Sequence, residues 1–162
     1  MEFLILHNGA LCVSEIYVQW EHYARTQNCG ALCVFEGLVR EEKSQEDLQS
    51  HHKDLQSDKV EGLSFDVYEP LLNKWFNKWQ NQAKEQGCIL LMAHSKGDVP
   101  KGKSSFMCAI ISSKRKAALG LYELFIEDFK ANAPIWKYDI IKGERVFALS
   151  KSQKIAGSGI LA

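Results

Sequence analysis

Two lysines, Lys130 and Lys137, flank a short segment that contains Pro134 and Trp136. The first lysine falls in the last turn of an expected helix, and the proline forces the chain after it into an extended turn. Both ammonium groups can therefore lie close together beside the Trp136 ring. Two amines held in this way are suited to act as a nucleophile, a base or a proton donor. The helix dipole alone also favours a cation at a helix C-terminus, so capping is the alternative interpretation.

Other basic residues are concentrated locally although the chain as a whole is neutral, with 20 Lys plus Arg and 20 Asp plus Glu. The stretch 96–116 contains six basic residues and one aspartate. This concentration predicts a pocket for an anion, and a solvated surface is the alternative that charge alone favours. A neutral chain has no global field that would recruit nucleic acid or an anionic membrane, so neither is expected as a partner.

No metal or cofactor is expected. The five cysteines form an odd set without a C-x-x-C pair, and three of them lie in apolar runs, which is typical of reduced core residues. The sequence has no apolar run near the roughly 20 residues of a membrane span, and its first residues lack a signal-peptide pattern. We therefore expect a cytoplasmic protein.

The elements that must position these residues follow from the spacing of apolar side chains. Strands are predicted over 3–7, 31–35, 63–67, 88–94, 105–112, 136–141 and 145–149. Helices are predicted from Ser14 to about Asn28, from Pro70 to about Gly87, and from about Arg115 to Lys130. This order predicts the α+β class, with a largely antiparallel sheet and helices packed on one face.

A single domain is expected over residues 1–150. Within it, the polar segment 41–59 has few large apolar side chains and is predicted to be a mobile loop. Residues 151–162, with Gly157, Ser158 and Gly159, are predicted to be a flexible C-terminal tail.

Several short motifs together resemble one family, the catalytic (large) subunit of molybdopterin synthase. The resemblance runs from about Gly30 to Phe147, and each motif is weak alone, whereas the set in this order is specific. The motifs are Phe35-Glu36-Gly37-Leu38-Val39-Arg40, Tyr68-Glu69-Pro70, Ser112-Ser113-Lys114-Arg115, and Lys130 followed by Ala133-Pro134-Ile135-Trp136-Lys137.

The resemblance implies an α/β-hammerhead fold and a homodimer. Each large subunit of that family binds a small, ubiquitin-like sulfur-carrier subunit, which makes a heterotetramer. The carrier's C-terminal Gly-Gly thiocarboxylate delivers two sulfurs to cyclic pyranopterin monophosphate, and the product is the dithiolene of molybdopterin, the precursor of the molybdenum cofactor. The family uses no metal in this step.

The resemblance also implies site residues. Lys130 and Lys137 match the catalytic lysines, whereas Arg40, Lys114, Arg115 and Phe35 match substrate-binding positions. The chemistry agrees, because guanidinium groups suit phosphate recognition and a lysine can stabilise charge that develops at a thiocarboxylate. Lys114 stands where family members often have a histidine, so the charge is kept and titration near pH 7 is lost.

Two non-catalytic functions remain as alternatives to an enzyme. One is a non-catalytic binding module for a phosphorylated ligand, and the other is a subunit that docks a ubiquitin-like partner without chemistry of its own.

Overall fold

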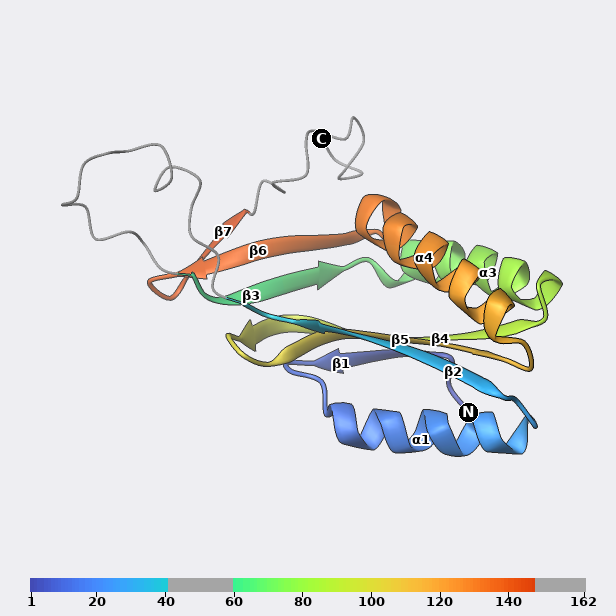
Figure 1. Ribbon diagram of the computed structural model, residues 1–162. Coiled ribbons are helices and arrows are strands. Elements are labelled where there is room, and N and C mark those ends of the chain that lie inside the picture. Colours follow the sequence, from blue (N-terminus) through green and yellow to red (C-terminus); the bar gives the residue numbers. More distant parts are fainter. Residues whose placement is uncertain (41–59, 148–162) are drawn as a thin grey trace, which may run out of the picture.

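The computed structural model describes residues 1–40 and 60–147 of the 162-residue chain. The predicted mobile loop 41–59 and the predicted tail 151–162 lie outside the described residues. The elements follow the predicted order (Figure 1). They are β1 (Leu4–Asn8), α1 (Val13–Thr26), β2 (Ala31–Leu38), β3 (Val60–Val67), α3 (Glu69–Glu85), β4 (Cys88–Pro100), β5 (Ser104–Ser112), α4 (Arg115–Asn132), β6 (Ile135–Ile141) and β7 (Glu144–Phe147).

Within the described residues, the strands form one seven-stranded sheet in the order β2-β5-β4-β3-β6-β7, and β1 pairs with β4 off this path. The β1–β4 pairing is parallel and the other pairings are antiparallel. The predicted α+β class and largely antiparallel sheet are therefore confirmed.

Strand β4 is longer than predicted. The predicted strand covers 88–94, but residues up to Lys96 pair with β1 and the stretch from Gly97 to Pro100 pairs with β3. Gly97 has a φ of +70°, which suits glycine, at the point where β4 changes partners. Backbone pairing with strands distant in the sequence, rather than side-chain hydrophobicity, makes this polar segment a strand.

The helices cover both faces of the sheet, so the prediction that they pack on one face is wrong. Figure 1 shows α3 and α4 on one side of the sheet and α1 on the other. Neighbouring residues of β4 enter two different cores: Leu90 and Met92 pack with α3 and α4, whereas Leu91 and Ala93 pack with α1. Continuous apolar runs such as 88–93 are typical of strands buried on both faces, because successive side chains point to opposite sides.

The C-terminal part of the fold agrees with the local sequence signals. Helix α4 ends at Asn132, and Ala133 is already extended (ψ 130°) before Pro134. Strands β6 and β7, which were both predicted, pair as a hairpin, in which Lys142 and Gly143 both have positive φ, the geometry of a tight hairpin turn. Among residues 1–40 and 60–147, the structure contains no helix that is long and apolar enough to cross a membrane.

Candidate functional site

Lys130 lies in the last turn of α4 and points its amine into solvent. Its side chain is 63% exposed, and its Nζ lies 3.8 Å from an Oε1 of Glu127. The Lys130 side chain is therefore not packed into an apolar surface. A long, exposed ion pair of this kind leaves the ammonium group available to a bound anion.

Lys137 lies on β6 directly opposite Phe65 of β3. Residues that face each other across an antiparallel pair share one face of the sheet, so the half-buried Lys137 side chain lies on the Phe65 face. The Phe65 ring is 4.9 Å from the ring of His94, which is also 5.7 Å from Phe129, the residue before Lys130. The two lysines are thus attached to one group of packed rings.

We call this group the aromatic floor: Phe65, His94, Phe106 and Phe129. Phe129 stacks on Phe106 with ring centroids 4.0 Å apart and planes within 10°. The aromatic floor joins α4 to three strands, and it lies on the side of the sheet that α3 and α4 cover.

Arg40 follows the end of β2 near the aromatic floor. The preceding residue, Val39, is buried in a cluster with Phe65 and Ile135, at the start of β6. The backbone of Val39 is also held by two hydrogen bonds to the β4–β5 turn, at 2.9 Å to the Lys103 carbonyl and 2.8 Å from the Gly102 amide. The described structure therefore brings Arg40, Lys130 and Lys137 to the same end of the molecule.

Phe35 occupies a different position, under the middle of α4. Its half-buried ring lies 5.8 Å from Phe106 and 6.3 Å from Tyr122. It therefore borders the aromatic floor from the β2 side.

Lys114 and Arg115 lie at the opposite end of α4 from Lys130. Fifteen residues at 1.5 Å each separate Arg115 from Lys130, which is about 22 Å along the helix. The predicted anion pocket within 96–116 is also divided, because β5 holds its two basic groups about 27 Å apart. One chain therefore does not bring all the predicted site residues together.

The start of α4 is nevertheless suited to an anion. Helices α1 and α3 each have a glutamate in the first turn, whereas the first turn of α4 has none. Its exposed residues there include Lys114 and Arg115. Cations at a helix N-terminus add to the positive end of the helix dipole, so both attract a phosphate.

His94 is the residue of this region that the sequence analysis missed. Its side chain is 3% exposed, and its Nδ1–H donates a 2.7 Å hydrogen bond to the Ser95 carbonyl oxygen. Burial lowers the pKa of His94 from 6.5 to about 4, which the hydrogen bond to Ser95 opposes in part. The imidazole is therefore neutral at pH 7. The only signal in the sequence was its place at the end of an apolar strand.

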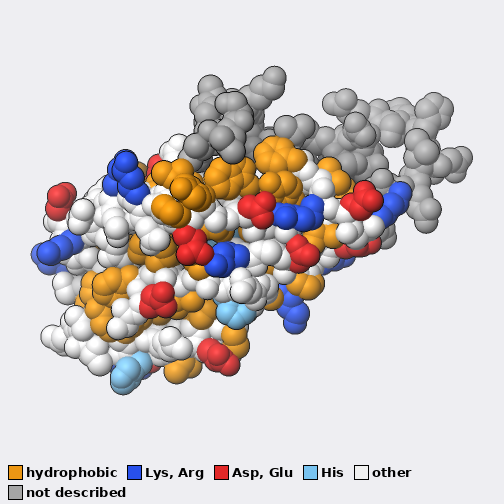
Figure 2. All heavy atoms as spheres, turned by 180° about the vertical axis from the view of Figure 1, so that it is seen from behind, with side chains coloured by type: hydrophobic (Ala, Val, Ile, Leu, Met, Phe, Trp, Pro, Cys, Tyr) orange, Lys and Arg blue, Asp and Glu red, His pale blue; other side chains and the backbone are white. Residues whose placement is uncertain are grey.

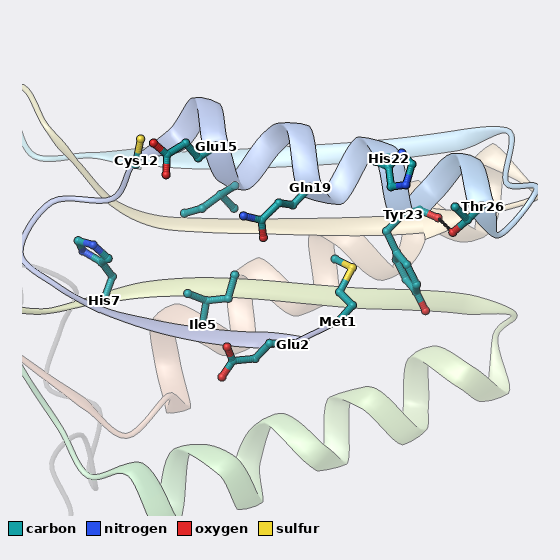
Figure 3. Close-up of a pocket in the computed structure, with 11 residues that line it drawn as sticks. Met1, Glu2, Ile5, His7, Cys12, Glu15, Gln19, His22, Tyr23 and Thr26 are labelled. Carbon is teal, nitrogen blue, oxygen red and sulfur yellow. Dashed lines mark hydrogen bonds between the residues drawn. The ribbon is translucent and has the colours of Figure 1, made fainter.

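A cavity of about 720 Å³ lies elsewhere, between β1 and α1. Figure 3 shows the side chains of His7 and Ile5 from β1 facing Glu15, Gln19 and others from α1. Among the residues that the structure describes, its lining contains no lysine or arginine, and none of the predicted site residues borders it. It is therefore a poor site for an anionic substrate.

Charge elsewhere on the described surface is mixed. Figure 2 shows acidic and basic side chains interspersed on the face seen from behind, in keeping with the net charge of zero. Within residues 1–40 and 60–147, the structure contains no cluster of His, Cys, Asp and Glu side chains that could hold a metal ion.

Comparison with known proteins decides the family. The family model described as MoaE protein matches residues 8–132, which is most of the chain. The chain belongs to the MoaE family. Residues 8–132 include Arg40, both ends of α4 and Lys130, so this MoaE chain carries most of the predicted site within the matched region.

The MoaE chain is similar to the molybdopterin synthase catalytic subunit of Helicobacter pylori (strain ATCC 700392 / 26695). The two are 49% identical over 154 residues, which covers 95% of this chain and 96% of the relative. A more distant relative of the same name from Dictyostelium discoideum is 29% identical and covers 73% of this chain and 70% of its own.

Comparison with solved structures gives the same family. The MoaE chain superimposes on a chain of the protein–protein complex of subunits 1 and 2 of molybdopterin-converting factor from Helicobacter pylori 26695, with a TM-score of 0.84, 47% identity and coverage of 99% of this chain and 100% of that one. The molybdopterin synthase structure from Staphylococcus aureus has a TM-score of 0.70 at 23% identity, over 91% of this chain and 97% of that one, and shows the shared fold.

Proposed function

We propose that this chain is the catalytic subunit of a molybdopterin synthase. It transfers two sulfurs from the C-terminal thiocarboxylate of a small ubiquitin-like carrier to cyclic pyranopterin monophosphate. The observation that carries this proposal is that Lys130 and Lys137 adjoin the aromatic floor of a MoaE chain, and that Arg40 directly follows Val39, which packs with Phe65 of that floor. Three cations at one end of the molecule suit a reaction in which both the sulfur donor and the acceptor are anions.

Each transfer forms a carbon–sulfur bond to the pterin side chain in place of a carbon–oxygen bond, whose oxygen leaves with a proton. The carbon–sulfur bond of the carrier breaks, and its carbonyl carbon takes an oxygen from water and leaves as a carboxylate. Negative charge moves between the carrier's acyl group and the departing sulfur during this exchange. We assign Lys130 to the stabilisation of that charge, because its exposed ammonium can reach a peptide terminus that enters from solvent. Lys137, on the same face of the sheet, is assigned to proton transfer at the pterin.

The substrate's phosphate is assigned to Lys114 and Arg115 at the start of α4. Because about 22 Å separates this end from Lys130 in one chain, one pterin phosphate cannot reach both. A complete pocket therefore needs a second copy of the chain, whose α4 N-terminus lies against the first copy's lysines. This geometry supports a homodimer, with one carrier per chain, as the functional assembly. We place the reaction in the cytoplasm, where the five free cysteines stay reduced.

The test is a reconstitution with thiocarboxylated carrier and cyclic pyranopterin monophosphate, in which the dithiolene product is followed by mass spectrometry. We expect product from the parent chain and a loss of about 10²-fold or more for Lys130→Ala. The matched control is Lys84→Ala, which removes an exposed lysine from the last turn of the neighbouring helix α3 and is expected to keep the parent rate. Carrier binding without any product would instead indicate a non-catalytic docking subunit.

The shared pocket has its own test. At a pterin concentration well below the parent KM, dimers of Lys130→Ala and of Arg115→Ala are each expected to lose most of their activity. Subunit exchange between them should restore about a quarter of the parent activity, because half of the dimers then contain one intact pocket. No recovery after demonstrated exchange would show that both residues act within one chain or at separate sites.

A further inference from the structure

Two tryptophans of α3 converge on a single carboxylate of α4. The indole Nε1–H groups of Trp75 and Trp79 donate hydrogen bonds of 2.8 and 2.6 Å to Oδ2 of Asp128. The other oxygen, Oδ1, accepts a 2.7 Å hydrogen bond from Nδ2 of Asn132. Trp75 and Trp79 are four residues apart and so lie on one face of α3. We call these four side chains the indole clasp.

The indole clasp adds direction to a contact that apolar packing already holds together. Phe125 of α4 is fully buried between the two tryptophans, at 5.6 Å from Trp75 and 5.4 Å from Trp79. Such packing stabilises without fixing an orientation, because the hydrophobic effect is not directional. Hydrogen bonds to a carboxylate depend on angle and distance, and charge makes them stronger than neutral ones. The clasp therefore sets how the end of α4 is rotated against α3.

The catalytic lysine depends on that rotation. Asp128 lies two residues before Lys130, in the last turn of α4, which ends at Asn132. Lys130 has little to orient its own side chain, since it is 63% exposed and its contact with Glu127 is a 3.8 Å ion pair. Its direction must come from the backbone of the last turn, which is held on one side by the Phe129–Phe106 stack and on the other by the indole clasp.

We propose that Asp128 is a positioning residue for Lys130, acting through its hydrogen bonds to Trp75 and Trp79. This inference rests on the catalytic role proposed above for Lys130. The indole clasp lies between α3 and the last turn of α4, and it touches none of the residues assigned to the phosphate. Its loss should therefore lower kcat and leave the KM for the pterin nearly unchanged.

Three variants separate positioning from simple packing. Asp128→Ala removes every bond of the clasp, and we expect kcat to fall about tenfold, since small misplacements of a catalytic group cost this much or more. Asp128→Asn keeps an oxygen that accepts both indoles, and the Asn132 amide can turn to present its own oxygen, so kcat should return to within about threefold of the parent. The double variant Trp75→Phe, Trp79→Phe keeps two aromatic rings and removes the two indole donors. It replaces Asp128→Ala in the test, with the same expected fall in kcat, if Asp128→Ala fails to fold.

The control is Leu72→Ala, which weakens the same α3 interface at a fully buried position outside the clasp. All chains are assayed in single turnovers with thiocarboxylated carrier, at a temperature at which circular dichroism shows each to be folded. Hydrogen exchange of residues 129–133 is measured in parallel, and we expect faster exchange there in Asp128→Ala and parent-like exchange in Asp128→Asn.

The proposal is overturned if Asp128→Ala keeps its kcat within twofold of the parent, if Leu72→Ala lowers kcat as much, or if Asp128→Asn is as slow as Asp128→Ala. A parent chain that forms no product refutes the proposed function instead. In that case the exchange of residues 129–133 still reports whether the clasp orders the last turn.

Discussion

Acidification should destabilise this protein through one buried side chain, His94. The unfolded chain binds a proton at this imidazole with a pKa near 6.5, whereas burial lowers the folded-state pKa of His94 to about 4. Between these two values the unfolded state holds more protons, so stability falls as the pH falls from 6.5 towards 4. The full effect is about 3 kcal/mol, of which about 2 kcal/mol is lost between pH 7 and pH 5.

The assay is urea unfolding at pH 7, 6 and 5, followed by circular dichroism, for the parent and for His94→Phe. Phenylalanine fits the aromatic surroundings of Phe65, Phe106 and Phe129 and cannot titrate. Loss of the hydrogen bond to Ser95 lowers the variant's stability equally at each pH. The difference between the two chains in how the free energy of unfolding depends on pH therefore reports the titration of the His94 imidazole alone.

We expect the parent to lose about 2 kcal/mol more than His94→Phe between pH 7 and pH 5. The matched control is His22→Gln, which removes an imidazole that is exposed to solvent in the folded chain. Equal losses in the parent and in His94→Phe would refute the reasoning, because they would place the pH dependence on other groups.

Two further predictions concern substrate binding and cysteine reactivity. Arg115→Ala should raise the KM for the pterin about tenfold or more while the carrier's Kd stays the same. Arg115→Lys should have a KM between those of the parent and of Arg115→Ala, because an ammonium lacks the guanidinium's paired donors. An unchanged KM in Arg115→Ala would remove Arg115 from the phosphate site. Burial raises the pKa of Cys108 to about 12, with a backbone hydrogen bond at Phe35 opposing it, so native-state alkylation at pH 8 should label the exposed Cys12 long before Cys108. Equal labelling rates in peptide mapping would contradict the buried position.

The order of elements was predictable because it depends on local spacing. The Pro134 signal correctly predicted the end of α4 and the extended chain that follows it. The alternation of Leu63, Phe65 and Val67 correctly predicted β3, although the strand begins at Val60. The apolar runs in β4 and β5 carried a signal for burial on both faces, which the prediction of helices on one face overlooked.

The candidate site was predictable only in part. Trp75 and Trp79 lie four residues apart in the predicted helix from Pro70 to about Gly87, and a buried indole N–H requires an acceptor. Which residue supplies it depends on the register of two helices, and Asp128 lies about 50 positions further along the chain. The same holds for the neutral His94, whose titration depends on rings that three other elements supply.

The sequence by itself determined the succession of strands and helices, the motifs of the MoaE family, and the kinds of side chain available for an anionic substrate. Only the tertiary structure decided which of those side chains meet. It brings Arg40 and Lys137 to the Lys130 end of α4 and leaves Arg115 about 22 Å away. The physical reason is that periodicity records the environment of each segment, whereas distances between segments are set by strand pairing and helix packing over long separations in the chain.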